Sequence, residues 1–167
     1  MDKGATSTTT KRISTKLLGD AGKHYALSRF SLTGIYAAKM PDHWEGYDLA
    51  VETGGGLVRV SVKTRIESVG WRAGKWFNWD DRKDCGWFVF IFKAANVQLR
   101  SWVVPAEVVE EHANKPGTKR IDPWFRDLSW KKLTQSILVA YEDNWSMNTD
   151  TPLKDAASQT LQETLSC

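Results

Sequence analysis

Residues 46–64 read GYDLAVETGGGLVRVSVKT, and this stretch decides the fold. Apolar residues recur at every second position on both sides of the glycine triplet Gly54 to Gly56. A period of two predicts β-strands, at 47–53 and at 57–64, and consecutive glycines predict the turn between them. The stretch therefore predicts an antiparallel hairpin in which each strand has one apolar face and one polar face.

The rest of the chain supplies helices and further strands around this hairpin. Apolar periodicity predicts helices at 17–33 and 106–112, and strands at 35–39, 86–93, 99–105 and 136–141. The segment 86–93, GWFVFIFK, is apolar on both faces, so we expect it at the centre of a sheet. The segment 66–84 is interpreted as a polar, tryptophan-containing excursion between strands. The segment 117–145 is expected to be irregular apart from the strand at 136–141. This order of elements predicts an α/β fold with a central mixed β-sheet flanked by helices.

Length and composition are those of one globular domain. The chain has 167 residues, and we expect a flexible arm at 1–15, a domain at 16–145, and a tail or helix at 146–167. No apolar run reaches the ~20 residues of a membrane span, and no secretory signal is recognisable. The two cysteines have no motif partners, which favours a reducing, cytoplasmic location. The net charge of +3 is compatible with nucleic acid as a partner.

The polar faces of the hairpin carry the residues that could take part in catalysis. Asp48 and Lys63 lie on adjacent predicted strands, and Ser61 is two residues before Lys63. Cross-strand neighbours approach to ~5 Å, so the acid and the lysine can converge. A carboxylate can hold Mg²⁺ for phosphodiester cleavage, with a lysine beside it to offset developing charge. The alternative is a simple cross-strand ion pair, worth ~0.2–1 kcal/mol.

With these residues in place, the chain resembles the PD-(D/E)XK nuclease superfamily over residues 16–109. The resemblance is to its small Holliday-junction-resolvase and restriction-endonuclease-like members. GDAGKHYALSRFSLTGI is similar to the first helix of that family, GYDLAV to the strand with its metal-binding aspartate, and VRVSVKT to the strand that ends in acid-x-lysine. The resemblance implies a restriction-endonuclease-like core, a DNA endonuclease activity that depends on Mg²⁺ or Mn²⁺, and a possible homodimer.

The resemblance also implies roles for individual residues. Asp48 would be the principal metal ligand and Lys63 the catalytic lysine. Ser61 stands where the family has an acid or a glutamine, and Lys23 stands where the first helix has its glutamate. Asp20, one helical turn before Lys23, is the residue expected to substitute as a second metal ligand.

Two functions follow from this pattern. The first is a metal-dependent DNA endonuclease. The second is a nuclease fold that has lost its metal site and now binds nucleic acid or a protein partner, since Ser61 and Lys23 both remove expected negative charge. The residues expected to contact nucleic acid are Arg59, Arg65, Lys23 and Trp71.

Overall fold

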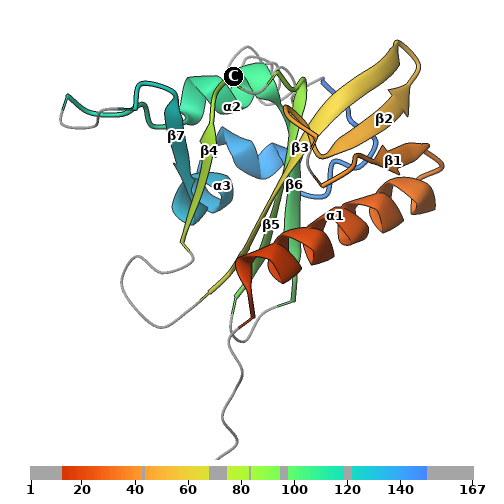
Figure 1. The fold of residues 1–167 in the computed structure, drawn as a ribbon, viewed down its shortest axis with the longest axis horizontal. Helices are drawn as coiled ribbons and strands as arrows, with labels where there is room; N and C mark the ends of the chain where they lie inside the picture. The colour runs from red at the N-terminus through yellow and green to blue at the C-terminus, as the bar shows by residue number, and fades with distance from the viewer. Residues whose placement is uncertain are drawn as a thin grey trace, which may run out of the picture.

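The fold is built on a five-stranded mixed sheet. The computed structural model describes residues 13–42, 44–67, 75–82, 84–94, 98–118 and 122–149. The strands of the sheet, in spatial order, are β1 (Ala37–Lys39), β2 (Leu49–Thr53), β3 (Gly56–Ile66), β5 (Trp87–Lys93) and β6 (Arg100–Pro105) (Figure 1). Strands β3 and β5 are parallel, and the other neighbours are antiparallel. The predicted α/β class with a central mixed sheet is confirmed.

The predicted hairpin is the β2–β3 pair. Its register places Leu49 opposite Val60 and Thr53 opposite Gly56. Gly56 has a φ of +112°, a conformation that suits glycine because it has no Cβ. Strand β3 extends well beyond its pairing with β2, and its second half pairs with β5 instead. The hairpin thus joins the edge strand β1, which pairs with β2, to the centre of the sheet.

Helix α1 (Thr15–Leu32) covers one face of this sheet (Figure 1). It begins after Ser14, whose hydroxyl accepts a hydrogen bond from the N–H of Leu17, and Gly34, with a φ of +78°, follows its C-terminal end. Ala26 and Phe30 of the helix are fully buried in a core that includes the alternate apolar residues of the hairpin. Both the helix and its glycine stop are confirmed.

A second layer covers the opposite face of the sheet. It contains a two-stranded antiparallel sheet of β4 (Trp76–Asp80) and β7 (Phe125–Ser129), with α2 (Ala106–His112), α3 (Trp130–Gln135) and the 3₁₀ helix η1 (Ile137–Tyr141). Strand β5 contributes to both cores: Trp87, Val89 and Ile91 pack on the α1 side, and Phe88, Phe90 and Phe92 on the other. The prediction of a central strand buried on both faces is confirmed.

Three predictions for the second layer are wrong. The segment 66–84 contains β4, where a polar excursion between strands was expected. The segment 117–145 contains β7 and α3, where irregular structure was expected. The segment 136–141 forms η1 and not a strand. Leu138 and Tyr141 are its buried residues, and a spacing of three places both on one side of a 3₁₀ helix.

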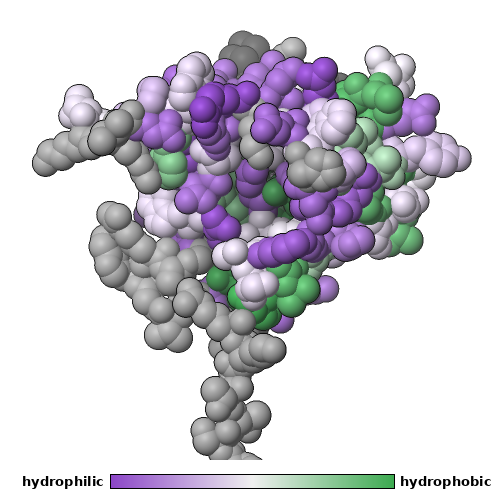
Figure 2. All heavy atoms as spheres, in the orientation of Figure 1, coloured by the Kyte–Doolittle hydropathy of each residue, from purple (hydrophilic) through white to green (hydrophobic). Residues whose placement is uncertain are grey.

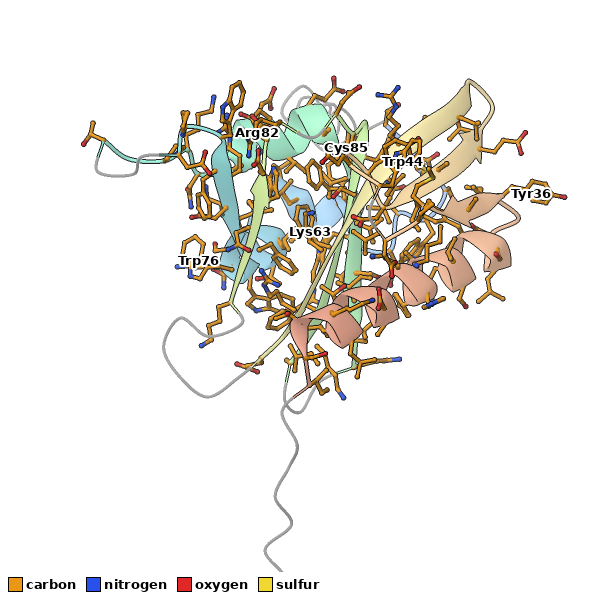
Figure 3. The ribbon with its side chains drawn as sticks, in the orientation of Figure 1. Tyr36, Trp44, Lys63, Trp76, Arg82 and Cys85 are labelled. Carbon is orange, nitrogen blue, oxygen red and sulfur yellow. The ribbon has the colours of Figure 1, made fainter. Side chains whose placement is uncertain are left out.

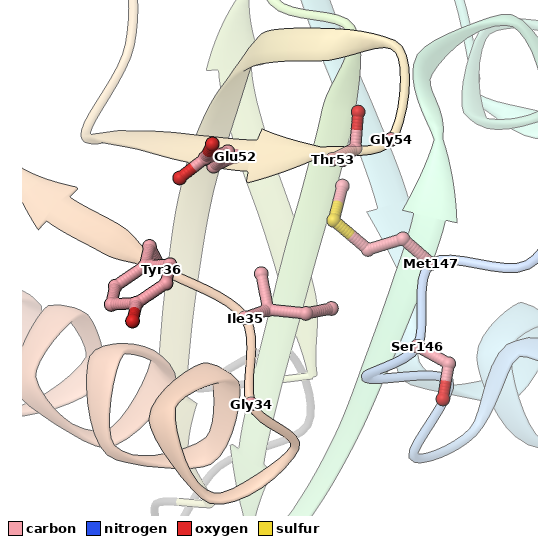
Figure 4. A pocket seen from close by; sticks show the side chains of 8 residues that line it. All are labelled: Gly34, Ile35, Tyr36, Glu52, Thr53, Gly54, Ser146 and Met147. Carbon is pink, nitrogen blue, oxygen red and sulfur yellow. The ribbon is translucent and has the colours of Figure 1, made fainter.

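The last described residues return to the α1 side of the sheet. Trp145 is 2% exposed, and its ring packs edge-on against Phe30 of α1. Met147 joins the same core, and Figure 4 shows its side chain pointing toward Thr53 at the end of β2. A hollow of about 530 Å³ opens here, lined by Gly34, Ile35, Tyr36, Glu52, Thr53, Gly54, Ser146 and Met147. The tail or helix predicted at 146–167 lies outside the described residues from residue 150 onward.

Candidate active site

Asp48 is held at the point where β2 and β3 separate. Its N–H donates to the carbonyl of Val60 at 2.9 Å, and Oδ2 accepts from the N–H of Val62 at 2.7 Å. The Ser61 hydroxyl donates to the same oxygen at 3.3 Å. The pairing of β2 with β3 begins at Leu49, so Asp48 satisfies a backbone donor of β3 that β2 no longer reaches. One carboxylate oxygen is therefore fixed by the fold, and the other faces α1.

The polar face of β3 is not open to solvent at its centre. Ser61 is 1% exposed, and Arg65 donates to the carbonyl of Trp76 on β4 at 3.0 Å. The second layer therefore lies over the face that the sequence presents as polar. Lys63, which is on the same face, is half-buried, and Figure 3 shows it on the β4 side of the sheet. Asp48 and Ser61 are thus in contact, and Lys63 lies two residues further along β3, where that strand pairs with β5.

Lys23 of α1 reaches Asp48 from the other side. Its Nζ lies 3.9 Å from Asp48 Oδ1, 3.5 Å from Asp20 Oδ1 and 3.9 Å from Asp42 Oδ1. The Lys23 side chain is 17% exposed, so its ammonium is largely enclosed by these carboxylates. The structure thus brings Asp20 and Lys23, both singled out from the sequence, to Asp48.

Two further lysines complete this charge network. Lys16 Nζ donates to Asp20 at 2.8 Å and to Asp42 at 3.2 Å, and Lys39 donates to Asp42 at 2.7 Å. The hydrogen bond from Lys39, followed by that from Lys16, lowers the pKa of Asp42 to about 2. The hydrogen bond from Lys16 lowers the pKa of Asp20. Both carboxylates are therefore ionised at neutral pH.

Asp42 is the residue of this network that sequence reasoning missed. It follows Pro41 just after β1, in a position typical of a turn residue, and nothing in the local pattern distinguishes it from other surface acids. Only the return of β1 alongside α1 brings it to Lys23. The signal available in the sequence was the position of Asp42 in the loop that precedes Asp48.

Cys85 lies close enough to Asp48 and Lys63 for their charges to affect the pKa of its thiol. Burial raises the pKa of its thiol to about 11. The positive charge of Lys63 acts in the opposite direction, and the negative charge of Asp48 adds to the rise. Cys85 is packed against the core of the second layer. The thiol is therefore a protonated, half-buried neighbour of the site at neutral pH.

The predicted nucleic-acid contacts lie in different surroundings. Arg59 is 53% exposed, forms an ion pair with Asp84, and its guanidinium lies 5.7 Å from the ring centre of Tyr47. Arg65 also donates to Asn78 at 2.5 Å, and burial lowers the pKa of its guanidinium. Trp71 lies outside the described residues. Contact between these residues and nucleic acid stays a prediction.

An open cleft adjoins the network at Asp42. Its volume is about 720 Å³, and it is lined by Asp42, Trp44, Glu45, Gly46, Asp80, Arg82 and Asp84. Figure 3 shows Trp44 and Arg82 above Lys63, with Cys85 between them. Hydrophilic side chains dominate the visible face of the molecule between α1 and β4 (Figure 2). The cleft is rich in carboxylates, so it favours cations over a bare phosphate.

The carboxylate oxygens around Lys23 are of the chemical type that binds a hard cation. Three carboxylates converge on one position, and carboxylate oxygens are the ligands that Mg²⁺ and Mn²⁺ prefer. That position already holds the Lys23 ammonium. Within the described ranges no group of three or more His, Cys, Asp or Glu side chains is arranged to hold a metal ion.

Comparison with solved structures identifies the fold. The chain is similar to a bacterial homing endonuclease, I-Ssp6803I, with a TM-score of 0.51 and 21% identity over 90% of this chain and 99% of that chain. It also matches Hjc, a Holliday junction resolvase from the archaeal hyperthermophile Archaeoglobus fulgidus, with a TM-score of 0.43 and 10% identity over 68% and 84% of the two chains. No protein-family model and no curated protein matches the chain.

The chain therefore has the fold of this homing endonuclease, a restriction-endonuclease-like α/β fold. The fold that the sequence resemblance implies is confirmed. None of the helices in the described ranges is long and apolar enough to cross a membrane.

Proposed function

We propose that the protein is a DNA endonuclease that hydrolyses phosphodiester bonds at the site formed by Asp48, Ser61 and Lys63. The observation that carries the proposal is the fixed position of Asp48. Its Oδ2 is locked by the N–H of Val62 and the hydroxyl of Ser61, and its Oδ1 is left facing a cation position. A preorganised carboxylate beside a half-buried lysine suits phosphoryl transfer, in which negative charge develops on the phosphate oxygens.

Each residue of the site has a role in this proposal. Lys63 offsets the charge that develops on the scissile phosphate, because a cation in a partly dry site acts more strongly than one in water. Ser61 orients Asp48 through its hydrogen bond and adds no charge of its own. Asp48 and Asp20 are the residues that would hold a Mg²⁺ or Mn²⁺ ion, which when bound polarises the phosphate and makes water a better nucleophile.

DNA would approach from the exposed side of the site. Arg59 is the most accessible of the described cations predicted to bind nucleic acid, and Lys23 and Arg65 lie closer to the protein interior. Contacts from these residues to phosphates would position the backbone without reading sequence. The substrate class proposed is therefore DNA, with its sequence or branch structure set by parts of the surface outside this site.

The direct test is cleavage of duplex, single-stranded and branched DNA in the presence of Mg²⁺ or Mn²⁺. Wild type is expected to cleave, and Lys63→Met to lose activity by at least about 100-fold, the effect of removing one electrostatic contact to a transition state. Lys93→Met is the matched control, since Lys93 is exposed at the end of β5 and is expected to leave the rate unchanged. No cleavage by wild type, or equal cleavage by wild type and Lys63→Met, would contradict the proposal.

One observation favours a second candidate, a nuclease fold that binds DNA without cutting it. The Lys23 ammonium stands among the carboxylates, and Ser61 is neutral, so the site holds less negative charge than a metal site needs. This candidate predicts salt-dependent DNA binding without cleavage. With three phosphate contacts, affinity is expected to fall about 40-fold between about 50 mM and about 200 mM salt. Affinity that does not change with salt would leave a protein-interaction role.

A further inference from the structure

Trp44 presents an aromatic ring to the cleft beside the candidate site. It is 50% exposed and lies in the loop that joins β1 to β2, four residues before Asp48. It lines the cleft of about 720 Å³, and Figure 3 shows it above Lys63. A single exposed aromatic ring is ordinary on a protein surface, but this one is placed to contact a ligand that enters the cleft.

The ring of Trp44 is supported on one side by its neighbours. Its backbone N–H donates to the carbonyl of Pro41 at 2.9 Å, which fixes the turn of the loop. Its ring meets that of Tyr47 at 75°, with the ring centres 6.3 Å apart, and the Arg59 guanidinium lies 5.7 Å from the centre of the Tyr47 ring. An edge-on contact takes up at most one of the two faces of the indole. A positioned aromatic surface is therefore available to a ligand that can stack.

The charges around the cleft limit what that ligand can be. Its other lining residues include an arginine paired with one of four acids: Arg82 with Asp80, and Asp42, Glu45 and Asp84. Carboxylates repel a phosphate group, but they do not repel an uncharged nucleobase. Carboxylate oxygens also accept hydrogen bonds from the amino groups of cytosine and adenine. The cleft therefore suits a base and not the phosphate attached to it.

The cations that suit phosphates lie along β3. Arg59 is 53% exposed, and its ion pair with Asp84 places it at the rim of the cleft. Lys63 is four residues later, so both lie on the same face of the strand, about 13 Å apart. A DNA backbone that follows this face would keep its phosphates near the two cations, while a base turned away from the backbone would enter the cleft.

We propose that Trp44 is a stacking platform for one unpaired nucleobase of a DNA substrate, with the phosphates that flank this base at Arg59 and Lys63. The substrate class is DNA that presents an unpaired nucleotide, as in a bulge, a gap or a single strand. A base in an intact duplex is stacked between its neighbours and would first have to be extruded, at a cost that an unpaired base does not carry. The inference rests on the proposed function in taking DNA as the substrate, and it does not depend on cleavage.

The experiment compares the affinity of the full chain for two DNA duplexes of equal charge, by fluorescence anisotropy without added metal ion. Each duplex has one extra nucleotide in one strand, which is an adenine nucleotide in the first duplex and an abasic nucleotide in the second. The difference in affinity therefore reports contacts with the base and not with phosphates. Wild type is expected to bind the adenine bulge about 5- to 150-fold more tightly, the equivalent of ~1–3 kcal/mol for one base stacked on an aromatic ring.

Three variants assign this preference to Trp44. Trp44→Leu removes the planar ring and keeps an apolar side chain, so it is expected to bind the two duplexes equally. Trp44→Phe keeps a ring and is expected to retain part of the preference. The matched control is Trp76→Leu, because Trp76 is also a partly exposed tryptophan, at 38%, and Figure 3 shows it well away from Trp44. It is expected to keep the wild-type preference.

Three results would overturn the inference: equal affinity of wild type for the two duplexes, a preference that survives Trp44→Leu, or an equal loss of preference in Trp76→Leu. The wild-type comparison needs no variant, so it decides the matter even if Trp44→Leu does not fold. DNA cleavage is measured separately. Wild type that prefers the adenine bulge but cuts no DNA would contradict the endonuclease and support this inference, whereas wild type that cuts DNA without the preference would do the reverse.

Discussion

Substitution of Gly22 by alanine is expected to destabilise the fold, because α1 and β3 leave no room for a side chain at this position. A Cβ on Gly22 would lie 1.8 Å from Oγ1, 2.9 Å from Cβ and 3.3 Å from Cγ2 of Thr64. Gly22 precedes Lys23, and Thr64 follows Lys63. This contact therefore sets how closely the two halves of the candidate site approach.

The magnitude follows from the geometry. Rotation of the Thr64 side chain can move Oγ1 away, but its Cβ is part of the strand and stays too close, so α1 or β3 must shift by about 0.5 Å to restore ordinary contact. Overpacking of this kind costs about 1–3 kcal/mol, and a helical glycine replaced by alanine gains about 1 kcal/mol. Gly19→Ala in the same helix meets nothing within 4 Å and provides the matched control. The difference between the two variants therefore isolates the overpacking, about 1–3 kcal/mol.

The assay is urea-induced unfolding followed by tryptophan fluorescence, with the free energy of unfolding obtained by linear extrapolation. Gly19→Ala is expected to be about 1 kcal/mol more stable than wild type, and Gly22→Ala less stable than Gly19→Ala. Thr64→Ala removes two of the three clashing atoms, so in the Gly22→Ala background it is expected to recover part of the loss. Equal stability of Gly19→Ala and Gly22→Ala would refute the packing described here.

Three other outcomes are expected. In a Cys167→Ser background, Cys85 is the single cysteine, and its alkylation at about pH 8 should be about 100-fold slower than that of a thiol with pKa 9.0, because its own pKa is about 11. Lys63→Met should slow the alkylation further, because the charge of Lys63 lowers this pKa. A rate equal to that of a free thiol would contradict this prediction. Asp42→Asn should lower the free energy of unfolding at neutral pH. The difference from wild type should vanish as the pH falls from about 4 through about 2, since the lowered pKa of Asp42 stabilises the fold only while its carboxyl is ionised. A difference that persists below that range would argue against the ion pairs. Trp145→Ala should cost about 3–5 kcal/mol in urea unfolding, and a loss below about 1 kcal/mol would show that Trp145 is not part of the core.

Local periodicity was enough to predict the first layer of the fold. The hairpin, α1 and β5 each carry a complete pattern in consecutive residues: alternation with a glycine turn, a helical stripe ended by Gly34, and a run that is apolar on both faces. In the second layer, α2 was predicted, but β4 and β7 were missed because their pairing is non-local. Strand β4 alternates buried Phe77 and Trp79 with exposed residues, yet its only strand partner in the described chain, β7, lies more than forty residues later by number (76–80 against 125–129).

The candidate site divides in the same way. The sequence alone predicted that Asp48, Ser61 and Lys63 share the polar side of one hairpin, because a period of two and a glycine turn indicate which residues share a face. The contact between Ser61 and Asp48 is found, whereas a joint role with Lys63 stays a prediction. Only the tertiary structure decided that this side is covered by a second layer and that Ser61 is buried. The packing of α1 through Gly22 likewise decided that Lys23, with Asp20 and Asp42, meets Asp48. Side chains from separate elements converge through packing, and no local pattern encodes such a meeting.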